Sequence, residues 1–109
     1  MTTSIVQYTL SNEANDTISI INYGARLTSW VTHVDNKKRN IILGYANIND
    51  YLSDPFYLGS VAGPYANRLS NAQIHIDNIA YALNKNEGTN QLHGGDKALS
   101  DLFWQLDYH

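Results

Sequence analysis

Two short segments carry the side chains best suited to chemistry in this sequence: Asn67-Arg68 and His93-Gly94-Gly95. A guanidinium is a planar cation with five donors in fixed directions, which suits a ring of hydroxyl oxygens. An imidazole donates or accepts a proton, which suits an oxygen whose protonation changes. The two glycines after His93 let the backbone adopt conformations closed to other residues and approach a ligand closely. Arg68 and His93 are therefore the first candidate site residues.

Each candidate also has an ordinary structural interpretation. Arg68 is either a surface arginine, one half of a structural ion pair, or a site residue. It follows a segment of small and aromatic residues, 61–66, that is too apolar for a solvated loop. We therefore expect packing to hold Arg68 in place and to direct it at a ligand. His93 is either a surface or core histidine, or a site residue.

Composition and charge exclude several classes of protein. The chain has 109 residues, enough for one domain, with seven Lys and Arg and a net charge of −3. The basic residues form no stripe, so nucleic acid is not an expected partner. Cysteine is absent, which excludes a disulfide framework and a thiolate metal site, and the four histidines lack zinc-ligand spacing. No signal peptide or membrane-spanning run is visible, so we expect a cytoplasmic protein that does not enter a membrane.

Short alternating runs of apolar and polar residues, broken by Asn, Asp and Gly, predict a mainly antiparallel β fold, a sandwich or a barrel. Strands are expected at residues 5–10, 17–22, 25–34 and 40–44, with a turn at 35–38. A hairpin is expected over residues 72–83, with Asp77-Asn78 as its turn, because Asn tolerates the left-handed conformation.

Little helix is expected. Residues 47–54 are weakly helical and end before Pro55, since the residue before a proline avoids the helical region. A long polar loop, residues 84–96, carries His93, and residues 103–108 predict the start of another strand. Asp54 and the other aspartates of these loops are interpreted as turn formers.

Several motifs occur in an order and spacing that resemble the aldose 1-epimerase (galactose mutarotase) family. They are Asn22-Tyr23-Gly24-Ala25, Ile42-Leu43-Gly44, Tyr51-Leu52, Gly63-x-Tyr65-Ala66-Asn67-Arg68, Asp77-x-x-x-Tyr81-x-Leu83, Asn86, Leu92-His93-Gly94-Gly95 and Trp104. The resemblance covers nearly the whole chain. It implies an antiparallel β-sandwich of the galactose mutarotase-like supersandwich type, of which residues 1–109 form the N-terminal part.

The resemblance also implies an activity. Such proteins interconvert the α and β anomers of aldohexoses such as galactose and glucose, without a metal or nucleotide cofactor. A base removes the proton of the anomeric hydroxyl, an acid protonates the ring oxygen, and the ring opens and recloses. The resemblance places Asn67, Arg68 and His93 in the sugar pocket, with His93 also catalytic because it polarises the region of the ring oxygen. The main acid histidine and the base glutamate come later in such chains, so we expect this chain to be inactive alone.

Two other functions stay open. A non-catalytic sugar-binding module keeps Arg68 and His93 as hydrogen-bond donors. A structural piece needs a partner chain or self-association, because a sandwich cut after a few strands leaves unpaired strand edges. A phosphosugar epimerase needs a basic pocket that these residues do not show.

Overall fold

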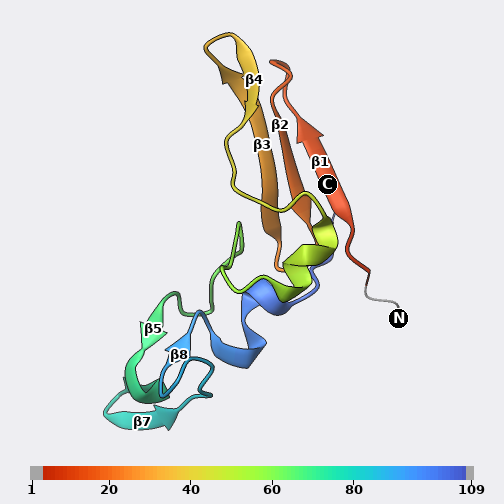
Figure 1. Cartoon of the computed structure of the whole chain (residues 1–109). Coiled ribbons are helices and arrows are strands. Elements are labelled where there is room, and N and C mark those ends of the chain that lie inside the picture. Colours follow the sequence, from red (N-terminus) through yellow and green to blue (C-terminus); the bar gives the residue numbers. More distant parts are fainter. Residues whose placement is uncertain (1–3, 108–109) are drawn as a thin grey trace.

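The computed structural model describes residues 4–107, which form a mainly antiparallel β protein in two parts (Figure 1). The larger part is a four-stranded sheet in sequence order: β1 (Gln7–Ser11), β2 (Thr17–Ile21), β3 (Arg26–Val34) and β4 (Lys37–Asn40). The smaller part has two two-stranded ladders: β5 (Arg68–Leu69) with β8 (Gln91–Leu92), and β6 (Gln73–Ile76) with β7 (Ile79–Ala82). The predicted fold class, mainly antiparallel β with little helix, is confirmed.

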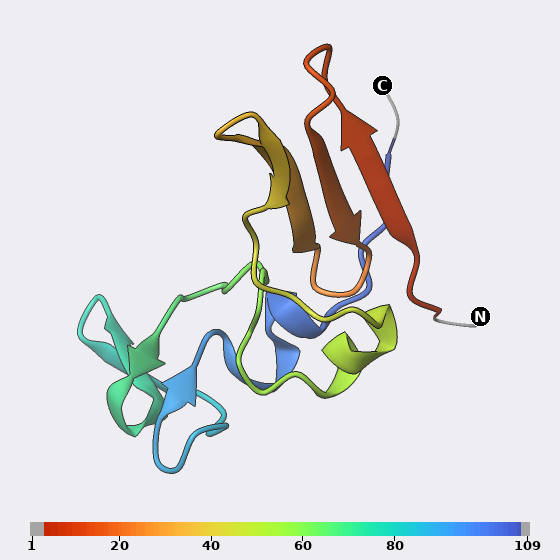
Figure 2. The ribbon, with the colours of Figure 1, turned by 45° about the horizontal axis from the view of Figure 1, so that its top comes forward.

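The helical elements are all short 3₁₀ turns. They are η1 (Ile48–Ser53), η2 (Ser70–Ala72), η3 (Gly95–Lys97) and η4 (Leu99–Asp101). The helix predicted at residues 47–54 corresponds to η1, which begins after an Asn47 side-chain cap and ends before Pro55. In the ribbon, the blue turns η3 and η4 lie between the two parts of the molecule, and the yellow-green turn η1 lies below the end of the sheet (Figure 2).

The hairpin between β3 and β4 differs from the prediction. Asp35 and Asn36 both have positive φ, 50° and 60°, and close a two-residue turn from which β4 pairs immediately. The predicted turn at 35–38 is therefore too long, and the predicted strand at 40–44 is wrong, because pairing ends at Asn40. All four residues of β4 are exposed, so its charged side chains carry no burial cost at the edge of the sheet.

The hairpin in the smaller part is as predicted. Ile76 pairs with Ile79, and Asp77 and Asn78 between them have φ of 49° and 63°. Asp and Asn adopt this left-handed region more readily than other non-glycine residues, which fixes the register of β6 and β7.

The end of the described chain makes only one β-bridge, between Phe103 and Tyr23. Trp104 N–H donates to the Asn22 carbonyl (2.7 Å), and Gly24 N–H donates to the Leu102 carbonyl (2.8 Å). These bonds join the segment to the β2–β3 turn instead of to a strand. The strand predicted at residues 103–108 is therefore wrong for 103–107, and Tyr108 lies outside the described residues.

The core is small and partly polar. Among residues 4–107 the buried apolar residues are Ile21, Tyr51, Ala72 and Ala98, whereas Leu43 is 77% exposed and Phe56 is 73% exposed. The radius of gyration is 17.1 Å, against about 13 Å for a compact domain of this length. The chain is therefore elongated, and much of its apolar surface is uncovered. Within the same residues there is no helix with the length and hydropathy to cross a membrane.

Candidate sugar-binding site and its support

The structure brings together the three residues that the sequence predicts as a site. Arg68 in β5 pairs with Leu92 in β8, so the residues that flank this pair, Asn67 and His93, also lie side by side. The ladder is only two residues long on each strand. It nevertheless closes the distance between segments that are twenty-five positions apart from Arg68 to His93.

Two hydrogen bonds join Asn67 to His93. The His93 N–H donates to the Asn67 carbonyl (3.0 Å), and the Asn67 N–H donates to His93 Nδ1 (2.9 Å). Because a backbone N–H is always the donor, Nδ1 is the acceptor and the proton of the neutral imidazole lies on Nε2. The backbone thus selects the tautomer, and Nε2–H is left as a donor for another group.

Arg68 is held by an ion pair that the sequence analysis missed. Its Nε donates to both carboxylate oxygens of Glu87 (2.9 and 2.7 Å), its Nη2 pairs with Oε1, and its Nη1 donates to Asn67 Oδ1 (3.3 Å). The two side chains are 53% and 35% exposed. Packing was expected to hold Arg68, and the structure instead shows charge and hydrogen bonds in that role.

The ion pair shifts the pKa values of both Arg68 and Glu87. The hydrogen bonds that Arg68 donates to Glu87, followed by the negative charge of Glu87, raise the pKa of Arg68 above its usual value. Hydrogen bonding from Arg68 lowers the pKa of Glu87, against a smaller opposing effect of burial. The pair is therefore ionised at neutral pH. No sequence signal marks Glu87 as the partner, since nineteen positions separate it from Arg68.

The two glycines after His93 serve the fold. Gly94 and Gly95 have φ of 99° and 75°. A Cβ on Gly94 would overlap the carbonyl oxygen of Gly63, and the Gly63 carbonyl also accepts from Leu99 N–H (2.9 Å). The close approach that the sequence predicts is therefore between two backbone segments of the protein.

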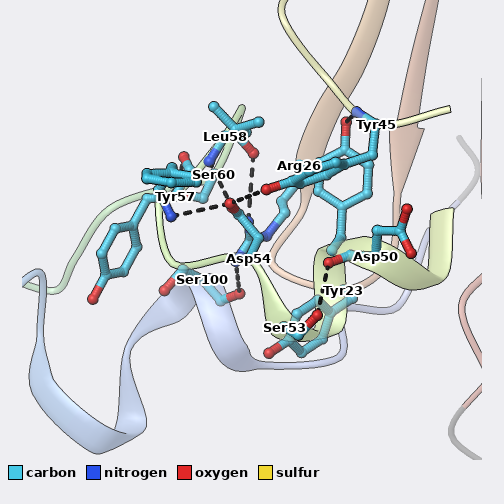
Figure 3. A network of polar contacts seen from close by, with 12 residues as sticks. Tyr23, Arg26, Tyr45, Asp50, Ser53, Asp54, Tyr57, Leu58, Ser60 and Ser100 are labelled. Atoms are coloured by element: carbon cyan, nitrogen blue, oxygen red, sulfur yellow. Dashed lines mark hydrogen bonds and ion pairs between the residues drawn. The ribbon is translucent and has the colours of Figure 1, made fainter. Parts of the chain in front are cut away.

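A second arginine–carboxylate pair, which the sequence analysis also missed, lies buried between the sheet and η1 (Figure 3). Arg26 Nη1 and Asp54 Oδ2 are 2.6 Å apart, and the two side chains are 2% and 0% exposed. Asp54 also accepts from Tyr45 OH (2.9 Å), Phe56 N–H (3.0 Å) and Leu58 N–H (2.8 Å). Burial raises the pKa of Asp54, but these four donors outweigh burial and lower it overall.

Asp54, expected to form a turn, caps the end of η1, and its Oδ1 accepts from the Phe56 N–H two residues later. Its carboxylate is buried rather than solvated. Arg26 Nη2 continues the network to the Ser100 carbonyl in η4 (3.4 Å), while Nε of Arg26 has no hydrogen-bond partner among the described residues. One buried guanidinium thus links β3 to the end of η1 and to η4. Charged residues are usually exposed, so sequence pattern alone pointed away from this role.

No group of three or more His, Cys, Asp or Glu within residues 4–107 could hold a metal ion. His33 lies 3.7 Å from Asp16 on the sheet, far along the chain from His93. His109 lies outside the described residues.

The fold and this geometry describe a mainly antiparallel β protein with a buried arginine–carboxylate pair beside its four-stranded sheet. Its smaller part carries the hydrogen-bonded cluster of Asn67, Arg68 and His93. A sequence profile of the aldose 1-epimerase family matches residues 6–109. The chain belongs to the aldose 1-epimerase family.

Individual relatives agree with this assignment. The aldose 1-epimerase of Escherichia coli K12 is 33% identical over 99 residues, covering 90% of this chain and 29% of that protein. The galactose mutarotase of Sus scrofa is 32% identical over 88 residues, covering 80% and 26%. The crystal structure of an aldose epimerase homologue from C. elegans superposes with a TM-score of 0.89 at 27% identity, covering 97% of this chain and 33% of that one. The chain thus spans about a third or less of the length of these relatives.

Proposed function

We propose that this chain is the N-terminal part of an aldose 1-epimerase-type β-sandwich and supplies sugar-binding residues for the interconversion of the α and β anomers of galactose or glucose. Asn67, Arg68 and His93 bind the sugar, and His93 also acts in catalysis by polarising the ring oxygen. One observation supports this proposal most: three residues from two distant segments form one hydrogen-bonded cluster, in a chain of this family. Asn67 and Arg68 in this cluster are exposed and His93 is half-buried.

The chemistry of the cluster fits a sugar ring. His93 Nε2–H is a neutral donor, and a neutral donor can polarise a ring oxygen without transferring charge to it. The Arg68–Glu87 pair presents donor and acceptor atoms side by side, the arrangement that adjacent sugar hydroxyls require. Glu87 offsets the charge of Arg68, which favours a neutral sugar over a phosphosugar.

Anomer interconversion also needs a base at the anomeric hydroxyl and an acid at the ring oxygen. The family resemblance implies that both groups come from later in such polypeptides, so we expect the chain alone to bind sugar without accelerating mutarotation. A cytoplasmic location stays a prediction.

A complementation assay tests this proposal. The chain is mixed with the part of the E. coli relative that lies outside the matched segment, and the optical rotation of freshly dissolved α-D-galactose is followed. We expect no acceleration from either part alone and an accelerated approach to equilibrium from the mixture. The mixture with His93→Ala should lose the acceleration, whereas the mixture with His75→Ala, an exposed histidine on β6, should keep it. If the chain alone accelerates mutarotation and His93→Ala abolishes that acceleration, the expectation that the chain needs catalytic groups from outside it is wrong.

A second role, as a piece that needs further strands, is favoured by the elongated shape and the exposed apolar residues. Leu10, on edge strand β1, is 61% exposed, and Trp30, on the same face of the sheet, is 43% exposed. We propose that further strands of the sandwich cover this face, whether from the same polypeptide or from a partner. Size-exclusion chromatography with light scattering should then show self-association of the isolated chain, and a stable monomer would count against this role.

A further inference from the structure

Tyr57 makes a contact with His93 that neither residue type nor spacing predicts. The phenol and imidazole rings are 4.7 Å apart between centroids and inclined at 65°, an edge-to-face arrangement. Both residues have positive φ, 57° for Tyr57 and 52° for His93. Bulky residues adopt this region rarely, and they keep it only where the surrounding structure fixes it. Two such residues in direct contact indicate a position that the fold maintains.

The turn that carries Tyr57 is fastened to the sheet. Ser60 donates twice to the Tyr57 carbonyl, from N–H (3.1 Å) and from Oγ (2.9 Å). The Leu27 N–H, at the start of β3, donates to the Gly59 carbonyl (2.9 Å). A Cβ on Gly59 would overlap the Leu27 carbonyl oxygen, so the turn sits directly on the strand. Tyr57 is thereby tied to a regular element rather than to a free loop.

Asp54 fixes the two residues that flank Tyr57. Its Oδ1 accepts from Phe56 N–H and its Oδ2 from Leu58 N–H, and the same Oδ2 pairs with buried Arg26. Figure 3 shows Tyr57 beside this network, with its ring directed away from Asp54. The buried ion pair therefore holds the backbone on both sides of Tyr57, while the ring reaches the other part of the molecule.

We propose that Tyr57 is a positioning residue for His93. Its ring limits the rotation of the imidazole, the Asn67 N–H holds Nδ1, and together they keep Nε2–H in one direction. The Arg26–Asp54 pair acts on His93 indirectly, because it holds the backbone on both sides of Tyr57. That the fixed donor meets a sugar rests on the proposed function, but the positioning itself does not.

The test is the tautomer of His93, read from long-range ¹H–¹⁵N correlations of the ligand-free chain at a pH where imidazoles are neutral. The unsubstituted chain should show the Nε2–H form. Tyr57→Phe keeps the ring and should leave the pattern unchanged. Tyr57→Leu removes the ring contact and should shift His93 toward the mixture of tautomers found in a free imidazole. Tyr65→Leu, a matched change at an exposed tyrosine, should have no effect.

An unchanged His93 pattern in a folded Tyr57→Leu protein would overturn the proposal. If that variant does not fold, the unsubstituted chain decides: nuclear Overhauser effects between the ring protons of Tyr57 and His93 are expected, and their absence would refute the contact. Where the chain binds galactose, Tyr57→Leu should weaken binding by about tenfold and Tyr57→Phe by less than about twofold. Since the tautomer is read without sugar, a failure of sugar binding leaves the positioning result intact, and the two failures are distinguishable.

Discussion

Arg26 with Asp54 and Arg68 with Glu87 are the same pair of chemical groups in opposite surroundings. The first pair is 2% and 0% exposed and bonds to backbone groups of two different segments, residues 56–58 and Ser100. The second is 53% and 35% exposed, and its bonds are to side chains of the same small part of the molecule. Water competes for the hydrogen bonds of the exposed pair but not for those of the buried pair. We therefore assign Arg26–Asp54 a role in stabilising the fold and Arg68–Glu87 a role in binding a ligand.

The largest effect is expected where the buried pair loses its acid. Asp54→Ala leaves the Arg26 guanidinium buried without its counter-ion and frees two backbone donors. We expect the free energy of unfolding to fall by about 3–5 kcal/mol. The control Tyr45→Phe removes only the hydroxyl that donates to Asp54 and should cost about 1 kcal/mol. Urea denaturation measures both, and equal effects would show that the ion pair is not the main contribution.

A smaller effect is expected at Gly94, which lies against the Gly63 carbonyl. Gly94→Ala puts a Cβ onto the Gly63 carbonyl, whereas Gly88→Ala places one in open space. Both glycines have positive φ, so both variants carry the backbone cost of about 1–2 kcal/mol. The overlap at Gly94 comes on top of that cost. A larger loss of the free energy of unfolding is therefore expected for Gly94→Ala, and equal losses would mean that the two segments are not in contact.

The next effect is the loss of stability at low pH, which should come from the buried Arg26–Asp54 pair rather than from the exposed Arg68–Glu87 pair. The pKa of Asp54 is lowered in the folded state, so its contribution to stability is present above the usual value of 3.8 and is lost as the pH falls through the folded pKa. The pKa of Glu87 is also lowered from 4.5, but this pair is exposed and screened by salt. Urea unfolding between pH 6 and pH 2 should show a loss of stability that Asp54→Asn flattens. A loss that Asp54→Asn leaves unchanged would contradict this assignment.

The smallest effect on the fold is expected at the exposed pair. Glu87→Gln should leave the urea midpoint unchanged, like Glu13→Gln on the exposed turn after β1. Loss of the carboxylate frees the Arg68 guanidinium, so galactose binding should weaken although stability does not. A fall in the urea midpoint as large as that of Asp54→Ala would mean that the exposed pair also belongs to the fold.

Local chemistry explains which features were predictable. The turn at Asp77-Asn78 and the end of η1 before Pro55 depend on the conformations of adjacent residues, so sequence reveals them. The β3–β4 hairpin was misjudged because the apolar run 41–43 suggested a strand, whereas the left-handed Asp35-Asn36 turn starts the pairing earlier.

The residues of the candidate site also fall into a predictable group and an unpredictable group. The Asn67, Arg68 and His93 cluster was predicted from residue type and resemblance, and the structure brings it together. Glu87, Tyr57 and the Arg26–Asp54 pair act through contacts between residues 19 to 36 positions apart along the chain, which no local pattern specifies. Supporting residues were therefore missed although the residues they support were found.

The Asn67, Arg68 and His93 cluster is proposed to bind a sugar, and the buried Arg26–Asp54 pair to support the cluster without touching the sugar. Titration of the ¹⁵N-labelled chain with D-galactose is the direct test. We predict saturable amide shifts at residues 67, 68 and 93, weakened by about tenfold or more in Arg68→Ala and unchanged in Arg39→Ala, a matched change on exposed strand β4. Shifts confined to other residues, or binding that Arg68→Ala leaves unchanged, would contradict it.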